Sequence, residues 1–532
     1  MKRSDSLPRL LAVISLICAF PLAAQIPVST AELTRQLQAV LTQQKFTGRI
    51  ESTLTKRLGR ALDPVKVELG RNLFFDKFLG LHGDNSCAGC HSPNHGFGDS
   101  QSIAIGVDNN DIVGLRRAGP RNQRRTPSVI NTAFYPKLMW NNRFSMVSGD
   151  PFNNSKGFSF PDPEGSARFP AGDARFKHLL TAQAHIPPTE LPEMAGFTGF
   201  KRTTMQLLPV AGAISGPTTI DFGIFDVPAH NFGGVPLPPP VVVQRPGPQV
   251  IFDEYRNEPI RDTLMGRINA NESWSYEFVK AFRGMSANDP VTIEMLAQAM
   301  AEFEFSLTYA NAPIDRFARG ESACMSDSQK RGGLLFFGKA NCVKCHAVSG
   351  QANEMFSDFE SHNAGIPQIA PKFGKTTGNV PFRDAQGQFS TLGNQDWGLY
   401  DLTGNIDDAY KFRSSPLRNV GVQPTFFHNG AFTKLADAMR YHLNATEGAR
   451  TYTPTRANIA ADLRSNTAPI APVLAGLDPL LRAPVSLTTA EFADLLAFVR
   501  DGLLDPRARP ENLARLIPKG VPSYLPLHRF EK

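Results

Sequence analysis

The chain contains Cys87-Ala88-Gly89-Cys90-His91 and Cys342-Val343-Lys344-Cys345-His346, two copies of the pattern C-x-x-C-H. This pattern is the attachment signal for c-type haem: two thiols form thioethers to one porphyrin and the histidine binds its iron. A redox-active C-x-x-C pair would not need the histidine, and the pattern occurs twice in a chain with 6 cysteines. We therefore predict two covalently bound haem c groups, with His91 and His346 as proximal ligands.

Residues 1–24 have the pattern of an export signal. Lys2, Arg3 and Arg9 supply positive charge ahead of the apolar run Leu10–Ala24. That run is too short for a comfortable membrane span, so we predict cleavage near Ala24 and export to the periplasm. An uncleaved membrane anchor is the alternative. Export agrees with c-type haem, which belongs to the outer side of a bacterial cytoplasmic membrane.

The length of the chain indicates how many domains it forms, and its charge indicates which kind of partner it binds. At 532 residues the chain can bury two cores. One haem motif lies in each half, so we predict haem domains at residues 25–290 and 291–532 after the signal at 1–24. The formal net charge of +7 is spread out, and nucleic-acid binding is not predicted. The one basic cluster follows the first motif, where it could neutralise haem propionates or form a solvated loop. It consists of Arg116, Arg117, Arg121, Arg124 and Arg125.

The hydrophobic pattern predicts a mainly α fold. Helical periodicity is clear in four segments: Thr292–Tyr309, Ser328–Gly338, Thr433–Leu443 and Thr489–Leu504. Strand signals are few and short. Long segments rich in proline and glycine are predicted to be irregular insertions, and such loops are usually functional or form interfaces. They are residues 150–172, 208–248 and 365–394.

Several further motifs, in a constant order, resemble the bacterial di-haem cytochrome c peroxidase family, which includes the MauG enzymes. The resemblance runs from about Val67 to Asp501 and is interrupted by the insertions. It rests on these blocks: Val67–Asp76, Arg125–Ser128 with Asn131 and Trp140, Gln183-Ala184 with Pro192-Glu193-Met194, Ala312–Phe317, Asp396–Gly404, Pro416–Val420 and Phe427–Gly430.

The resemblance implies three catalytic residues. Glu193 matches the distal acid/base that moves a proton between the two oxygens of peroxide, and Gln183 would orient peroxide by hydrogen bonding. Trp140 matches the aromatic electron relay between the haems, although a buried core tryptophan is the simpler interpretation. The family's activatable peroxidases carry a removable distal histidine, and its matching position here is Val107, which cannot bind iron. We therefore expect an open iron at the His91 haem, as in MauG.

The resemblance also bears on the second iron and on calcium. Carried across from Pro416, the position of the family's second axial ligand is His442, with Met439 as the competitor and Tyr441 as a weaker one. The family's calcium site matches Arg125, Gln423 and Thr425. An arginine in place of the family's asparagine argues against a cation there, so calcium is left open and doubtful.

The predicted function is that of a periplasmic di-haem c-type peroxidase or oxidase. It would reduce H2O2 at the N-terminal haem, with electrons passing through the C-terminal haem from a small cytochrome c or cupredoxin. One alternative is MauG-like or rubber-oxygenase-like oxidation of an organic or protein substrate. Another, from a different class, is a non-catalytic di-haem electron carrier, in which Glu193 and Gln183 would have no role. The sequence leaves the physiological donor, the substrate and a homodimer open.

Overall fold

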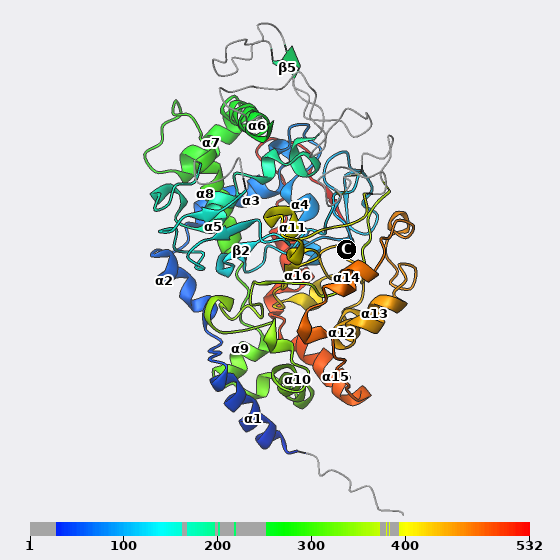
Figure 1. Ribbon diagram of the computed structural model, residues 1–532. Coiled ribbons are helices and arrows are strands. Elements are labelled where there is room, and N and C mark those ends of the chain that lie inside the picture. The colour runs from blue at the N-terminus through cyan, green and yellow to red at the C-terminus, as the bar shows by residue number, and fades with distance from the viewer. Residues whose placement is uncertain are drawn as a thin grey trace, which may run out of the picture.

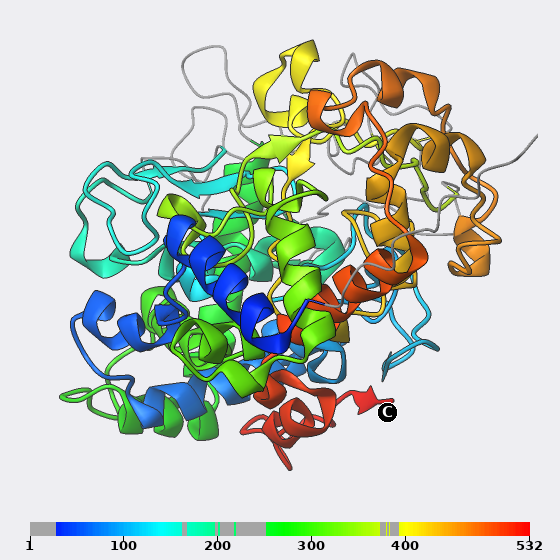
Figure 2. The same ribbon diagram turned by 90° about the horizontal axis from the view of Figure 1, so that it is seen from below.

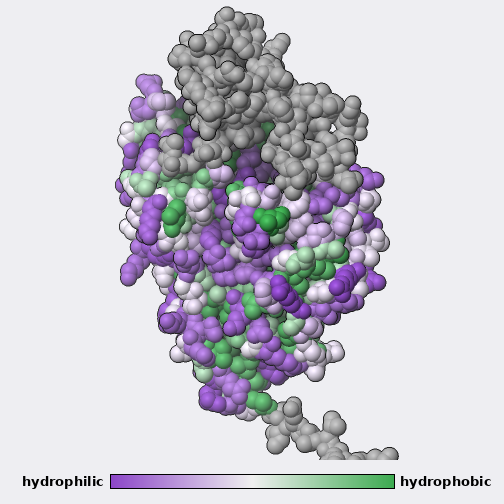
Figure 3. Space-filling model, viewed as in Figure 1, coloured by the Kyte–Doolittle hydropathy of each residue, from purple (hydrophilic) through white to green (hydrophobic). Residues whose placement is uncertain are grey.

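The computed structural model describes residues 28–161, 168–196, 252–372 and 393–531, with residues 201–202, 218–219, 379 and 382. The predicted export signal lies outside these ranges, as do most of the predicted insertion at 208–248 and much of that at 365–394. Within the described ranges, no helix combines the length and the apolar character needed to cross a membrane. On the face drawn in Figure 3, polar and apolar residues are interspersed.

The regular structure is mainly helical, as predicted (Figure 1). The helices of the first half are α1 (Thr30–Gln43), α2 (Leu54–Leu58), α3 (Pro64–Phe75), α4 (Cys87–Cys90), α5 (Leu179–Gln183), α6 (Phe252–Asn269) and α7 (Glu272–Ala281). Those of the second half are α8 (Ile293–Ser306), α9 (Pro313–Ala318), α10 (Asp327–Phe337), α11 (Tyr400–Thr403), α12 (Leu435–Leu443), α13 (Ala445–Thr451), α14 (Ala471–Ala475), α15 (Thr489–Ala497) and α16 (Pro510–Leu513).

The strands are short, as the sparse strand signals predict. They are β1 (Ile112–Val113), β2 (Lys137–Leu138), β3 (Phe144–Met146), β4 (Phe158–Ser159), β5 (Lys201–Arg202), β6 (Thr218–Thr219), β7 (Ser361–His362), β8 (Phe412–Arg413) and β9 (Arg529–Phe530). The antiparallel sheet β2-β3-β4 places the predicted insertion at 150–172 against the rest of the chain.

The four predicted helices are present as α8, α10, α12 and α15. Helix α10 begins at a capping box in which Ser326 accepts from the Gln329 amide and Gln329 bonds back to the Ser326 amide. Helix α15 has the same device. We predicted that α15 reaches Leu504, but it changes at Phe498 into a wider π-helical turn that ends at Gly502.

Two helix pairs frame the two haem motifs. Helix α3 precedes the first motif and packs on α8, and α10 precedes the second and packs on α15. Each pair crosses at a glycine. A Cβ on Gly70 would lie 1.9 Å from the Ala299 carbonyl oxygen, and a Cβ on Gly332 would lie 2.0 Å from that of Asp494. Any larger residue would force the two helices apart. Glycine therefore sets the distance between the two helices that frame each haem motif.

Segments distant in sequence complete both cores. Helix α1 packs against α10 (Figure 2), with Leu37 in the core that contains Phe498. The C-terminal segment packs against the first helix pair, and β9 pairs in parallel with β1. Helix α8 follows the predicted boundary at 290/291 yet packs on α3. The domain division therefore stays a prediction, and the packing of the core favours a boundary after α8.

Candidate haem sites and distal pocket

The first motif lines a cavity of about 360 Å³. Cys87 and Cys90 lie at the two ends of α4, and the His91 amide caps that helix by bonding to the Cys87 carbonyl at 2.8 Å. His91 Nδ1 lies 3.3 Å from the Phe97 carbonyl oxygen. That contact directs Nε2 to the cavity, and burial lowers the pKa of His91 to about 4. The imidazole is therefore neutral, the form that binds a metal.

The second motif lines a cavity of about 250 Å³ in the same way. His346 Nδ1 lies 3.0 Å from the Phe356 carbonyl oxygen, and burial lowers the pKa of His346. Both proximal histidines therefore have the backbone contact that commonly orients a metal-bound imidazole.

His442 faces His346 across this second cavity. The centroids of the two rings are 6.4 Å apart. Imidazole nitrogens bind divalent metals at about 2 Å, which places the centroids of two opposed rings about 6 Å apart. Met439 also lines the cavity. Tyr441 does not line it, and its hydroxyl donates to the Gly365 carbonyl at 2.5 Å. The geometry favours His442 as the second axial ligand.

Two buried arginines indicate that these cavities suit an anionic group. Arg125 and Arg413 are each 5% exposed, and both line both cavities. Among the described residues, Arg125 Nε and Arg413 Nη1 have no hydrogen-bond partner, and neither guanidinium forms an ion pair with a carboxylate. Burial lowers the pKa of each to about 10, so both stay cationic at neutral pH. The propionates of haem would supply the missing acceptors, so the residues present fit haem.

The rest of the predicted basic cluster is engaged elsewhere. Arg116 pairs with Glu531 at the C-terminus, and Arg121 pairs with Asp462. Arg117 donates to backbone carbonyls and to Asn85. Arg124 lines the first cavity but pairs with Asp396 at 2.6 Å. Arg125 is therefore the member of this cluster best suited to a propionate. Arg413 was missed from the sequence because it lies far from either motif along the chain.

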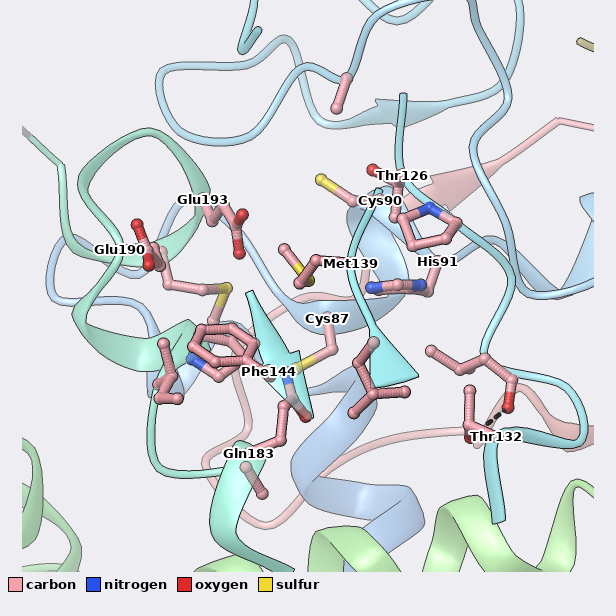
Figure 4. A pocket seen from close by; sticks show the side chains of 18 of the residues that line it. Cys87, Cys90, His91, Thr126, Thr132, Met139, Phe144, Gln183, Glu190 and Glu193 are labelled. Atoms are coloured by element: carbon pink, nitrogen blue, oxygen red, sulfur yellow. Dashed lines mark hydrogen bonds between the residues drawn. The ribbon is translucent and has the colours of Figure 1, made fainter. Parts of the chain in front are cut away.

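Glu193 and Gln183 are brought together in the first cavity. Gln183 ends α5, and Glu193 lies on a π-helical turn, Leu191–Ala195, on the side of the cavity away from His91 (Figure 4). The Pro192 carbonyl accepts from the Val107 amide at 3.2 Å, and the Glu193 carbonyl accepts from Asn85 Nδ2 at 2.7 Å. These bonds fix the turn that presents the carboxyl group.

The environment of Glu193 suits proton exchange near neutral pH. Burial raises the pKa of Glu193 most, the Glu190 carboxylate also raises it and Arg143 lowers it, and together they bring it to about 7. Val107, at the position of the family's removable histidine, is 1% exposed and is not among the residues that line the cavity. His82 and His95 are also absent from the lining of this cavity.

Trp140 lies between the two cavities and lines both. Its indole Nε1 donates to the Arg125 carbonyl at 2.6 Å, and its own carbonyl accepts from the Arg413 amide at 2.7 Å. The tryptophan is thus held between the backbones of the two residues that carry the uncompensated guanidinium groups. This position is compatible with the predicted role of Trp140 as an electron relay between the two haems.

The first cavity is also lined by Glu190, Arg143 and Glu304, for which no role was predicted from the sequence. Burial raises the pKa of Glu304 to about 7, and Thr132 donates to it at 3.2 Å. The sequence pattern could have marked Glu304 as a candidate, because this residue interrupts the apolar face of α8. No comparable signal marks Glu190, whose partner Arg143 lies on a separate segment.

Two groups of residues have the composition of a possible cation site. Arg125 donates to the Gln423 side-chain oxygen, and Thr425 Oγ1 donates to the Gln101 carbonyl at 3.0 Å. The guanidinium therefore occupies the neighbourhood that the resemblance gives to calcium. Among the described residues, Cys345, Asp358 and His362 place ligand atoms within 4.8 Å of one another. Haem attachment would use Cys345, and His362 is bonded at both nitrogens to Asp358 and Asp478, so this cluster does not suit a metal.

Comparison with known proteins identifies the relatives of this chain. Residues 64–210 and 244–323 match the family model for di-haem cytochrome c peroxidase, a span that includes the first haem motif. Over these residues the chain is similar to di-haem cytochrome c peroxidases. The comparisons support a haem oxidoreductase of the cytochrome-c peroxidase type.

Individual relatives come from both branches of the family. The chain is 24% identical over 388 residues to cytochrome-c peroxidase IdrP1 of Pseudomonas sp. (strain SCT), covering 71% of each chain. It is 22% identical over 419 residues to the methylamine utilization protein MauG of Methylorubrum extorquens, covering 79% of each. Among solved structures, a MauG-like protein associated with microbial copper homeostasis is 21% identical, with a TM-score of 0.48 over 84% of this chain and 92% of that one.

Proposed function

We propose that the chain is an exported di-haem peroxidase that reduces hydrogen peroxide at the His91 site. Electrons would reach this site through the His346 site. The observation that carries the proposal is the carboxyl group of Glu193, which faces the cavity of His91 and has a pKa of about 7. A carboxyl group poised near neutral pH can both accept and return a proton.

The residues of the distal pocket have distinct tasks. Cys87, Cys90 and His91 would hold a haem, which would supply the iron and the electrons for the reduction of peroxide. Glu193 accepts the proton from one oxygen of H2O2 and returns it to the other, which leaves as water. Gln183 orients the peroxide by a hydrogen bond. Trp140 contacts both cavities and carries electrons between them, while His346 and His442 hold the second iron.

A MauG-like oxidation of an organic or protein substrate is the second candidate. It is favoured by Val107, which offers no distal ligand to the first iron, and by His442, which offers imidazole where a thioether would raise the potential of the second. The small donor, a cytochrome c or cupredoxin, would serve the peroxidase. Periplasmic localisation is part of the proposal in both cases and rests on residues 1–24.

Electron paramagnetic resonance of the as-isolated ferric protein, before and after H2O2, tests the proposal. We expect one high-spin and one low-spin haem, with both signals lost on addition of peroxide. Two low-spin haems that do not react would indicate an electron carrier, or a peroxidase that needs reduction first.

A matched pair of variants tests the role of Glu193. Glu193→Gln should slow the reaction with peroxide by roughly 10²- to 10⁴-fold, the usual contribution of a general acid/base. Glu304→Gln removes another buried carboxyl group of the same cavity, on the side of Thr132, and should have little effect. Equal losses in the two variants would contradict the assignment.

A further inference from the structure

Glu193 shares its turn with a second acidic residue that forms an ion pair. Glu190 Oε1 accepts from Arg143 Nη2 at 2.6 Å, and both residues line the cavity with Glu193. Glu190 also opens the turn: its carbonyl accepts from the amides of Glu193 at 3.2 Å and of Met194 and Ala195 at 3.0 Å. Figure 4 shows the carboxyl groups of Glu190 and Glu193 on the same side of the pocket. One residue therefore fixes the backbone of the turn and places a charge beside Glu193.

Arg143 is held in this place by contacts of its own. Its guanidinium lies 4.5 Å from the centroid of the Phe144 ring, at the start of β3. The ion pair therefore joins the turn to the β2-β3-β4 sheet. Because Glu190 and Arg143 carry opposite charges, they act on the proton affinity of Glu193 in opposite directions.

Other polar groups packed on the turn are uncharged or directed elsewhere. Asn85 binds the Glu193 carbonyl, and Cys87 and Cys90 are uncharged as thioethers. His82 packs against Gly196, and Arg267 donates to the carbonyls of Gly80 and Leu81. Among the described residues, Glu190 and Arg143 are the charged groups that act on Glu193.

We propose that Glu190 and Arg143 are positioning residues that set the charge around Glu193 and thereby the pH range over which Glu193 exchanges a proton. This inference rests on the proposed function of Glu193. The ion pair holds the acid/base group at neutral pH by balancing one negative charge against one positive charge.

The test compares Glu190→Gln, Arg143→Gln and the double variant in the haem-loaded enzyme. Fluoride is the probe, because a nearby acid that is protonated favours anion binding to ferric haem. Spectrophotometric titration at a series of pH values gives the midpoint of the pH dependence without turnover. The pH dependence of the reaction with H2O2 is measured in parallel.

The two single variants should move the midpoint in opposite directions. Glu190→Gln leaves Arg143 unbalanced and should lower it by about one pH unit, whereas Arg143→Gln leaves Glu190 unbalanced and should raise it by about as much. The double variant should return close to the wild type. Arg143→Lys and Glu190→Asp, which keep the charges, should stay near the wild type, and a midpoint that moves in them as far as in the glutamine variants would overturn the inference.

The outcomes separate this inference from the proposed function. Glu193→Gln should abolish the pH dependence, and if it does not, Glu193 is not the acid/base group and both ideas fail. If it does, but the two single variants shift the midpoint in the same direction or not at all, the pair has only a structural role and the inference alone is overturned.

Discussion

We predict that the buried ion pair between Asp315 and Arg418 is essential for the stability of the fold. Arg418 Nη1 and Nη2 donate to the two carboxylate oxygens of Asp315 at 2.7 Å each, and both side chains are 0% exposed. Asp315 also accepts from the Ala312 amide at 2.8 Å, and Arg418 Nε donates to the Glu354 carbonyl at 2.7 Å. The pair thereby joins two of the sequence blocks, Ala312–Phe317 and Pro416–Val420.

Asp315→Asn is expected to destabilise the folded chain by about 3–5 kcal/mol. The substitution keeps the shape of the side chain but leaves the guanidinium charge of Arg418 buried without a counter-charge, and it turns an amide N–H₂ toward another donor. The measurement is equilibrium unfolding by denaturant, followed by circular dichroism and by the haem absorption of the loaded protein. Asp501→Asn is the matched control, because Asp501 pairs with Arg500 at the surface. Its expected cost is at most about 1 kcal/mol.

Two results would refute the reasoning about this pair. The first is a cost for Asp315→Asn no larger than that of Asp501→Asn, which would mean that water or a rearranged neighbour compensates Arg418. The second concerns the double variant Asp315→Leu with Arg418→Met. It removes both charges and should recover most of the loss, because much of the cost comes from the unpaired charge. No recovery would indicate that packing, not charge, accounts for the effect.

Four further predictions concern the haem sites. Asp358 and Asp478 raise the pKa of His362 from 6.5 to about 9. The stability that this contact adds should therefore be complete below pH 6.5 and lost as the pH rises through 9. Unfolding at a series of pH values should show the loss, and His362→Asn should make the free energy of unfolding less dependent on pH in this range. His442→Met should raise the potential of the second haem by on the order of 0.1 V in a redox titration, whereas Met439→Leu should leave it unchanged. Trp140→Phe should lower steady-state turnover with a small electron donor more than it lowers the first reaction with peroxide, and equal effects would argue against the relay. Chelation with EDTA should leave the haem spectra unchanged, because Arg125 supplies the cation, and a spectral change reversed by calcium would contradict this.

Short-range patterns were sufficient for much of the chemistry. Attachment of haem requires two thiols and a histidine at fixed spacing on one turn of chain, so C-x-x-C-H predicts the number of haems and both proximal ligands before any folding is considered. The helix next to each motif is equally local, as the capping box at Ser326 shows for α10. Glu193, Gln183 and His442 could be proposed because their motifs resemble those of the family.

Contacts between distant segments account for the rest. Helix α1 belongs to the core of the second motif, although it lies near the start of the chain, and β9 at the other end pairs with β1. No local pattern marks such partners, because any amphipathic helix can cover any apolar surface of suitable size. The same is true of Arg413 beside Trp140 and of Arg143 beside Glu190. A buried charge is recognised only by what surrounds it, and in this protein those surroundings come from segments that meet only after folding.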